Sequence, residues 1–251
     1  MIKILLSGCN GKMGQVITRL SEQYDDLSIV AGYDITDSGK NPYPVFSDLR
    51  KCSVRPDVLI DFSNPAALES ILTYATSTEI PVVIATTGHS QTQARMLKKT
   101  SEIIPVFYSA NMSLGINLLI GLVKKAAKLL QTSFDIEIVE KHHNQKIDAP
   151  SGTALAIADA VNSVLDQKHE YVYDRHSRRK KRSRNEIGIH AIRGGTIVGE
   201  HSVIFAGNDE IIEIKHSALS KEIFATGALS AARFIIGKKP GMYDMNDLVG
   251  R

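Results

Sequence analysis

Short apolar runs alternate with amphipathic stretches over roughly the first 110 residues of the chain. Nearly every position of these runs is apolar, which predicts strands that are covered on both faces. The five predicted strands are Ile2–Ser7, Ile29–Tyr33, Val58–Phe62, Val82–Ala85 and Val106–Ser109. After the first strand, Met13, Val16, Ile17 and Leu20 recur at helical spacing and form one apolar stripe. The alternation indicates βαβ units, and therefore an α/β fold with a parallel sheet.

The pattern changes after Asn111. A long helix with one apolar face leads to a strand at Asp135–Glu140, and Ser151 opens a second helix that runs to about Leu165. Three long strand patterns follow, at Ile187–Arg193, Ile197–Phe205 and Ile211–Ser217. A turn at 207–209 joins the last two strands. We expect an open mixed sheet in a second domain of the α+β kind.

The last predicted helix runs from about Lys221 to Ile236 and stops at Gly237, with Pro240 beyond it. We expect this helix to return to the first domain. Residues 1–112 and 221–251 would then form one domain and residues 113–220 a second one. A chain of 251 residues is long enough for two such cores.

Composition narrows the class of protein. Hydrophobic residues make up 43% and charged residues 23% of the chain, as in ordinary globular proteins. Cys9 and Cys52 lie far apart and form no CxxC pair, which argues against a disulfide framework or structural zinc and fits a reducing compartment. No apolar run reaches membrane-spanning length, and the first residues lack the pattern of a secretion signal. We therefore expect a cytoplasmic protein without membrane contact.

Three glycines, Gly8, Gly11 and Gly14, lie between the first strand and the first helix. Glycine there lets phosphate oxygens approach backbone N–H groups at a helix N-terminus, as in Rossmann-like dinucleotide-binding domains. Asp34 follows 20 positions after Gly14, at the end of the second strand, where a carboxylate can accept ribose hydroxyls. The alternative is a tight turn of any α/β protein, with Asp34 as a solvated strand end.

Cofactor preference and the rest of the crevice are less sharply defined. Asp34 repels a 2′-phosphate and no Arg follows it, which favours NADH over NADPH. Lys12 and Lys40 could still supply charge for NADPH. The segments Thr86–Gly88 and Ser109–Met112 follow the fourth and fifth strands, and ligands of open α/β sheets bind outside the carboxyl ends of strands. Each segment alone could equally be a plain turn or a helix cap.

The densest chemistry lies between Glu137 and Ala154. His142, His143 and Lys146 precede a Ser-Gly-Thr turn at 151–153 that opens a helix. Positive side chains beside the N–H groups of a helix start suit an anionic substrate. A reduction by hydride also needs a proton, which His142 or Lys146 could donate.

Two acidic residues, Glu140 and Asp148, are better suited to orient the basic groups than to act as acids, because a carboxylate would repel an anionic substrate. Other interpretations of this loop exist. A histidine there could be purely structural, and Ser151 could be an ordinary helix cap. A zinc site would need a third ligand at suitable spacing, and the neighbouring Lys146 favours anions instead.

The stretch 140–154, EKHHNQKIDAPSGTA, resembles the signature of the dihydrodipicolinate reductase family, also called 4-hydroxy-tetrahydrodipicolinate reductases. Further family segments match in order at 8–14, 61–63, 86–88, 109–112 and 187–201. The resemblance therefore covers nearly the whole chain. It implies NAD(P)H-dependent reduction of the cyclic product of dihydrodipicolinate synthase to tetrahydrodipicolinate, on the route to diaminopimelate and lysine. Whether the ring is hydroxylated or dehydrated stays open.

The resemblance also implies roles for particular residues. His142 and Lys146 would form the proton-donor pair, and His143, Gly152 and Thr153 would bind the substrate carboxylates. The implied cofactor-binding residues are Gly8, Cys9, Asn10, Gly11, Lys12, Met13, Asp34, Thr86, Thr87, Gly88, Ser109, Ala110, Asn111 and Met112. No metal is implied. Met112 stands where several members have Phe, which implies a less rigid contact with the nicotinamide.

The family is typically a homotetramer whose second domains pair their sheets, which implies the same assembly here and explains three long strands that would otherwise be exposed. Hinge closure between the domains is also implied. The Arg that follows the ribose-site acid in some members is absent from this chain. The assembly state itself does not follow from the sequence alone.

A basic run, Arg175–Arg184, interrupts the second domain. It could be a nucleic-acid arm. It lacks interleaved aromatics and any adjoining recognition motif, so an exposed or substrate-facing loop is favoured and no nucleic-acid partner is expected. Two rival functions remain. One is another two-domain dehydrogenase of amino-acid metabolism, of the aspartate or homoserine type. The other is a non-catalytic dinucleotide-sensing regulator that binds nucleic acid through this run.

Overall fold

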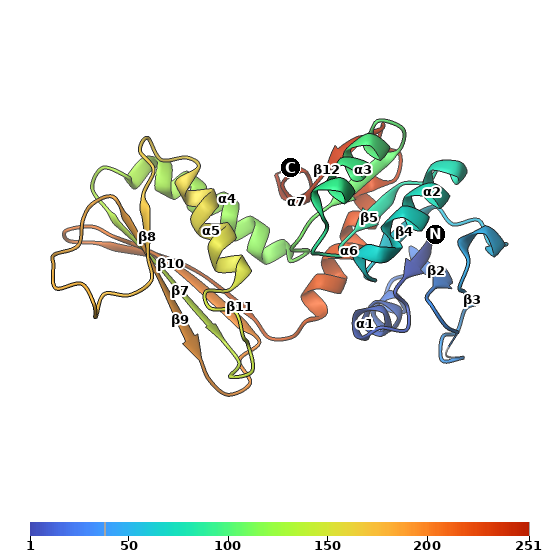
Figure 1. Cartoon of the computed structure of the whole chain (residues 1–251), viewed down its shortest axis with the longest axis horizontal. Coiled ribbons are helices and arrows are strands. Elements are labelled where there is room, and N and C mark those ends of the chain that lie inside the picture. The colour runs from blue at the N-terminus through green and yellow to red at the C-terminus, as the bar shows by residue number, and fades with distance from the viewer. Residues whose placement is uncertain (38, 251) are drawn as a thin grey trace. The chain divides into compact units, whose positions relative to one another are not determined.

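The computed structural model describes residues 1–37 and 39–250, and these residues fall into two compact units. The first unit joins Met1–Leu114 to the segment that begins at Glu222, and the second spans Gly115–Lys221. Figure 1 shows the chain coloured along its length, with the C-terminal red segment returning to the blue N-terminal unit. The last helix therefore belongs to the first unit.

The first unit is built on a seven-stranded sheet in which every neighbouring pair of strands is parallel. In spatial order the strands are β12 (Gly241–Tyr243), β6 (Pro105–Tyr108), β5 (Val82–Ile84), β4 (Val58–Asp61), β1 (Ile2–Ser7), β2 (Leu27–Tyr33) and β3 (Val45–Phe46). From β3 to β6 the order is 3-2-1-4-5-6, which is the order of dinucleotide-binding folds. The predicted Rossmann-like sheet is confirmed. Its two shortest edge strands, β3 and β12, were not predicted.

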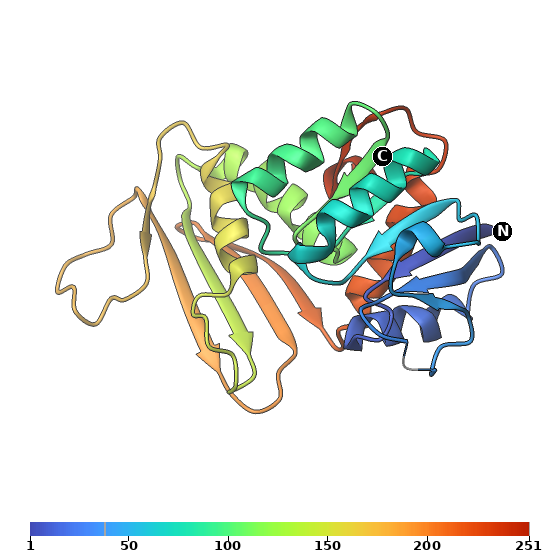
Figure 2. The same cartoon turned by 45° about the vertical axis from the view of Figure 1, so that its right-hand side comes forward.

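Helices cover both faces of this sheet, as Figure 2 shows. One face is covered by α2 (Leu68–Thr78) and α3 (Gln91–Ser101), and the other by α1 (Lys12–Ser21) and α6 (Glu222–Ile235). Short elements complete the unit; they are the 3₁₀ turns Leu49–Lys51 and Pro65–Ala67 and the helix α7 (Met245–Val249). Because both faces are buried, strands such as β5 are apolar along their whole length.

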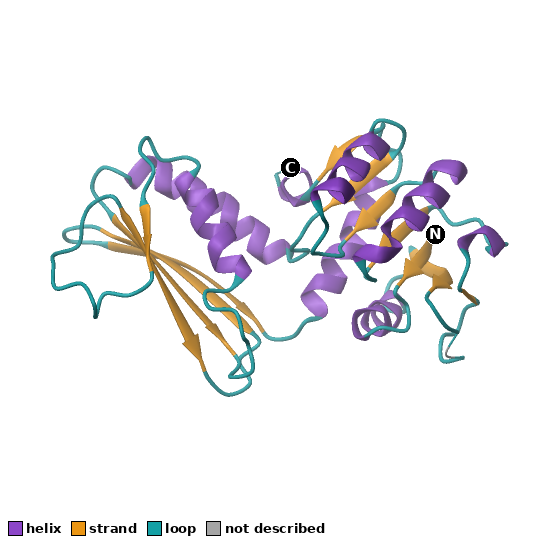
Figure 3. Cartoon of the chain, in the orientation of Figure 1, coloured by secondary structure: helices purple, strands orange, loops and turns teal. Residues whose placement is uncertain are grey.

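The second unit is a mixed sheet covered by helices on one face (Figure 3). Its strands, in spatial order, are β11 (Ile211–Ala218), β10 (Gly199–Ala206), β7 (Asp135–His142), β9 (Glu186–Arg193) and β8 (Glu170–Val172). The helices are α4 (Leu114–Leu130) and α5 (Gly152–Asn162). Along β7, buried and half-buried positions alternate, so Ile136, Ile138, Glu140 and His142 face the helices. The predicted open mixed sheet is confirmed, with β8 as an unpredicted edge.

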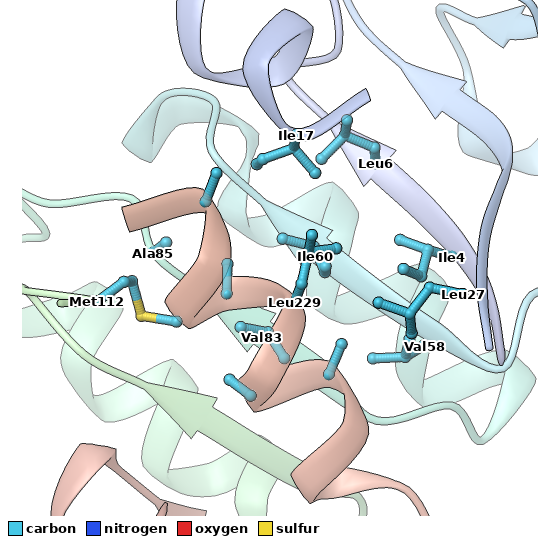
Figure 4. Close-up of a cluster of buried hydrophobic side chains, with 14 of the residues drawn as sticks. Ile4, Leu6, Ile17, Leu27, Val58, Ile60, Val83, Ala85, Met112 and Leu229 are labelled. Carbon is cyan, nitrogen blue, oxygen red and sulfur yellow. The ribbon is translucent and has the colours of Figure 1, made fainter. Parts of the chain in front are cut away.

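The core of the first unit depends on a close approach between α6 and the loop that follows β6. A Cβ added to Gly227 would lie 1.7 Å from the carbonyl oxygen of Met112, so only glycine fits. The Met112 side chain then packs among Val83, Ala85 and Leu229, as Figure 4 shows. Gly227 therefore sets how closely α6 lies on the sheet.

We predict that Gly227→Ala lowers the free energy of unfolding by about 2 kcal/mol or more, because the added methyl group overlaps backbone and cannot rotate away. Gly121→Ala, inside α4, is the matched control, since a Cβ there meets nothing within 4 Å. That variant should gain about 0.5–1 kcal/mol from helix propensity. Denaturant unfolding of both variants measures the difference, and equal stability of the two would contradict the packing described.

Candidate functional site

The turn between β1 and α1 requires glycine. Gly8 has a φ of 78°, and a Cβ on it would lie 2.5 Å from the Phe62 carbonyl oxygen. A Cβ on Gly14 would lie 2.2 Å from the Gly8 carbonyl oxygen. Gly11 is the N-cap of α1 and offers no side chain to the first-turn N–H groups. The turn thus presents backbone donors at a helix N-terminus, the arrangement that binds phosphate groups.

A cavity of about 520 Å³ lies beside this turn, within the range of small-molecule sites. Its walls come from residues that follow β1, β2 and β4, so it lies where the strand order reverses. Gly8, Gly11 and Asp34 line it, as the sequence predicted for a cofactor site. Residues of the segment after β4 also line it, and the sequence reasoning missed them: Asn64, Ala66, Ala67 and Ser70. They carry no pattern that marks a ligand site.

Asp34 is positioned by the backbone around it. Its Oδ2 accepts the Asn10 N–H at 2.9 Å, and its Oδ1 accepts the Ile35 N–H at 2.8 Å. Each carboxylate oxygen can accept more than one hydrogen bond, so both keep capacity for a ligand hydroxyl. The side chain is half-exposed beside the cavity. Asp34 therefore has the geometry to hold a ribose.

Two predicted cofactor residues have their side chains inside the core instead. Cys9 is fully buried, and burial, with Asp34 adding to it, raises the pKa of its thiol to about 11. The Met112 side chain is only 2% exposed and packs under α6 (Figure 4). The structure therefore places this side chain in the core, and its implied contact with a nicotinamide stays a prediction.

The remaining predicted cofactor segments follow β5 and β6, on the same edge of the sheet as the cavity but outside its lining. Thr86 is buried, whereas Thr87 and Gly88 are exposed. The 109–113 turn is held by its own side chains: Ser109 Oγ donates to the Asn111 carbonyl at 2.9 Å, and Asn111 Oδ1 accepts the Ser113 N–H at 3.0 Å. Lys12 and Ala110 are exposed, and Met13 is half-buried.

In the second unit, the end of β7 holds a buried carboxylate. Glu140 is 0% exposed, and both of its oxygens are used. Oε2 bonds His142 Nδ1 at 2.6 Å and accepts from Arg193 Nη1 at 2.8 Å. Oε1 accepts from Arg193 Nη2 at 2.7 Å and from the Ser151 N–H at 3.0 Å. The predicted pairing of Glu140 with a basic group is confirmed, whereas Arg193 was missed.

These contacts decide the charge of Glu140. Burial alone raises the pKa of this carboxyl, but the hydrogen bonds from Arg193 and His142 outweigh it and leave the pKa below its usual value. The hydrogen bond that Arg193 donates to Glu140 also raises the pKa of Arg193. Glu140 is therefore a carboxylate at neutral pH, and it accepts the Nδ1–H of His142. The other ring nitrogen, Nε2, lies beside Gly199 of β10, where an added Cβ would be 3.1 Å from it.

A third histidine, His201, packs against the ring of His142. His201 Nε2 lies 3.1 Å from Ser151 Oγ, and its ring stands edge-on to the His142 ring with 5.3 Å between centroids. Burial, followed by the nearby His142, lowers the pKa of His201 to about 4. His201 is therefore neutral at physiological pH and supports Ser151. The sequence reasoning did not single it out, because its role depends on the pairing of β10 with β7.

The loop after β7 carries the other predicted residues. Lys146 Nζ lies 2.8 Å from Asp148 Oδ1, and this contact lowers the pKa of Asp148. The pairing predicted for Asp148 is therefore confirmed. Ser151 caps α5 by accepting the Ala154 N–H at 3.1 Å. Gly152 is exposed, with nothing within 4 Å of an added Cβ, and His143 and Thr153 are half-exposed. The structure thus brings His142 and Lys146 into one region but pairs each with a different acidic residue.

The basic run is held to the sheet of the second unit. Arg182 contacts Asp135 and Glu137 at 2.9 Å each, and Arg175 lies 2.8 Å from Glu186. Arg178 lies 2.8 Å from Glu170. Three arginines of the run are therefore engaged in ion pairs, while Arg179, Lys180, Lys181 and Arg184 are exposed. This pairing gives the arginines a structural role that their sequence pattern did not indicate.

The described residues contain neither a metal-binding cluster nor a membrane-spanning helix. Across residues 1–37 and 39–250, no group of three or more His, Cys, Asp or Glu side chains is placed to hold a metal ion. In the same part of the chain, no helix combines the length and the apolar character needed to cross a membrane.

The low pKa of His201 predicts a pH dependence of stability. Between about pH 6.5 and pH 4 the unfolded chain binds more protons at this histidine than the folded chain does. Its contribution to stability is therefore complete above this window and is lost as the pH falls through it. Compared with His201→Gln, the wild type should lose about 2 kcal/mol more unfolding free energy between neutral pH and about pH 4.5. Parallel losses in both proteins would contradict a neutral, buried His201.

The chain matches one family along nearly its whole length. Residues 2–112 match the N-terminal part of dihydrodipicolinate reductase and residues 115–249 match its C-terminal part. A 4-hydroxy-tetrahydrodipicolinate reductase of Caldanaerobacter subterraneus subsp. tengcongensis is 56% identical over 99% of this chain and 98% of its own length. That of Clostridium tetani is 52% identical over 98% of this chain and 96% of its own.

Solved structures agree on the fold. A dipicolinate-bound dihydrodipicolinate reductase from Paenisporosarcina sp. TG-14 has a TM-score of 0.83 at 24% identity, covering 98% of this chain and 99% of that one. The DAP dehydrogenase of C. glutamicum in complex with DAP has a TM-score of 0.60 at 15% identity, covering 99% and 95%. Together with the sequence matches, these findings show that the chain is an oxidoreductase and belongs to the dihydrodipicolinate reductase family.

Proposed function

We propose that the chain reduces the cyclic imine dicarboxylate made by dihydrodipicolinate synthase to tetrahydrodipicolinate, as its relatives' name implies. The observation that carries this proposal is the cluster at the end of β7, where two histidines and a lysine adjoin the N-terminus of α5. A ring with two carboxylates fits such a cluster, because both cations and helix N–H groups stabilise negative charge.

Each group of the cluster has a proposed task. His143 and the N–H groups of Gly152 and Thr153 bind the substrate carboxylates, since Gly152 leaves the helix start open to a ligand. His142 and Lys146 are the proton donors to the ring atom that becomes basic on reduction. Glu140 and Asp148 hold these two donors from behind. Glu140 therefore orients His142, whereas Asp148, which also interacts with the Gly152 backbone at the start of α5, orients Lys146.

The first unit supplies the cofactor site in this proposal. The glycine turn, Asp34 and the adjacent cavity fit the pyrophosphate and adenosine of a nicotinamide dinucleotide, and the turns after β5 and β6 fit its far end. Reduced nicotinamide supplies the hydride when it is bound. We propose NADH as the better cofactor, since Asp34 favours ribose hydroxyls over a 2′-phosphate. Lys12 and Lys40, both exposed, leave NADPH usable.

We further propose a cytoplasmic homotetramer, without nucleic-acid or membrane partners, in which the second units pair their sheets. Among the described residues, no helix covers the face of this sheet opposite α4 and α5 (Figure 3), and β11 at its edge exposes Ile211 and Ile212. An uncovered sheet with an exposed apolar edge strand is a surface that oligomers bury. The pairing of Arg175, Arg178 and Arg182 with acidic residues supports a structural rather than nucleic-acid-binding run.

The direct test is NADH and NADPH oxidation by the purified protein in the presence of the synthase product. We predict turnover by the wild type and a loss on the order of a thousandfold in Lys146→Ala, because a charged proton donor is removed. Lys168→Ala, an exposed lysine of the same unit, should keep full activity. Near-normal turnover by Lys146→Ala would refute its role, and an inactive wild type would refute the function.

A second prediction concerns the ribose. Asp34→Ala should weaken NADH binding about tenfold or more, because two charge-assisted hydrogen bonds are lost. NADPH should lose less, since the same change relieves repulsion of the 2′-phosphate. Fluorescence titration with each cofactor measures both constants, with the exposed Asp25→Ala as control. An equal loss for both cofactors would remove Asp34 from the ribose site.

A further inference from the structure

Arg193 links the two halves of the proton-donor cluster. It lies at the end of β9, directly opposite His142 in the parallel pairing with β7. Its two terminal nitrogens contact the two oxygens of Glu140 at 2.7 and 2.8 Å. Nη2 also donates to the Asp148 carbonyl at 2.6 Å. One guanidinium therefore contacts the carboxylate that holds His142 and the residue whose side chain holds Lys146.

We propose that Arg193 is a positioning residue for the reduction, acting on His142 through Glu140 and on Lys146 through the Asp148 segment. The inference rests on the proposed function, because it assumes that these two cations serve the reaction. It goes beyond that function because it assigns to one residue the task of holding both proton donors, His142 and Lys146, in position.

The geometry explains why arginine is needed there. A guanidinium fork contacts both carboxylate oxygens at once and so fixes the plane of Glu140, which a single ammonium cannot do. With that plane fixed, the 2.6 Å bond to Nδ1 sets the direction of the His142 ring. The Ser151 N–H on Oε1 ties the start of α5 to the same carboxylate. The ends of β7 and β9, the loop after β7 and the start of α5 are therefore all held by contacts with Glu140 or Arg193.

The charges around His142 support the same view. Glu140 faces it from its own strand, Arg193 from β9, and the neutral His201 from β10. Lys146 and Asp148 form their own pair in the loop. Glu140 without Arg193 would be a buried anion with only partial compensation, which is costly in the interior. Arg193 thus lets a carboxylate orient the imidazole at the buried end of β7.

The first test is Arg193→Lys, which keeps the charge and removes the fork. We expect turnover to fall about tenfold to a hundredfold, as misplacement of a donor by roughly 1 Å can do, while the NADH dissociation constant stays the same. Arg178→Lys is the matched control, since that arginine has an exposed pair with Glu170 in the same unit. Unchanged turnover in Arg193→Lys, or a parallel loss of NADH binding, would overturn the proposal.

A second readout does not depend on turnover. The short Nδ1–H bond to Glu140 should give a downfield proton resonance, identified by its loss in His142→Asn, and Arg193→Lys should shift or broaden it. An unchanged resonance would overturn the inference even if the wild type proved inactive on the proposed ring. The double variant Arg193→Met with Glu140→Gln removes both charges, so no unpaired buried charge is left to destabilise the fold. Turnover by this double variant should stay low. Full turnover would contradict the proposal, because it would mean that Arg193 serves only to neutralise Glu140.

Discussion

The second unit is organised around the ionised carboxylate of Glu140. Removing a carboxylate from water costs several kcal/mol, and the cost is offset only when charge and hydrogen bonds surround it. Here the Arg193 fork, the His142 ring and the Ser151 N–H use both oxygens. Each of these groups belongs to a different position around the loop that follows β7, so satisfying one buried ion also fixes the geometry of that loop.

The first unit relies on steric constraints rather than charge. The strand order places a crevice between β1 and β4, and the lack of a side chain at Gly8 lets the turn approach the segment after β4. The lack of a side chain at Gly14 lets α1 lie against the turn itself. Gly227 also lacks a side chain, which lets α6 lie against the Met112 carbonyl. Close backbone contacts therefore shape the glycine turn of the first unit, whereas a buried ion shapes the end of β7 in the second unit.

The sequence predicted the long elements well, because strands such as β1 and β9 and helices such as α4 carry several apolar residues at one period. It missed β3, β8 and β12, since two or three residues show no period. The chemistry of the 140–154 loop was visible because His142, Lys146 and their acids lie close along the chain. Arg193 and His201 were not, because they reach Glu140 only through the register of β9 and β10.

Residue identity also did not show which atoms face a ligand. Cys9 and Met112 lie in segments with the expected cofactor pattern, yet their side chains fill the core. The basic run illustrates the converse, since Arg182 looks like part of a charged arm and instead binds two acids on the sheet. In both cases the direction of each side chain depended on packing that only the folded chain defines.

The most direct test of this account is the charge of Glu140 in the folded protein. An infrared difference spectrum between the wild type and Glu140→Gln at neutral pH reports it. The account predicts that the glutamate contributes carboxylate stretching bands and no carbonyl band of a protonated acid. A protonated-acid band at neutral pH would contradict it, because a neutral Glu140 could not hold Arg193 and His142 as the structure places them.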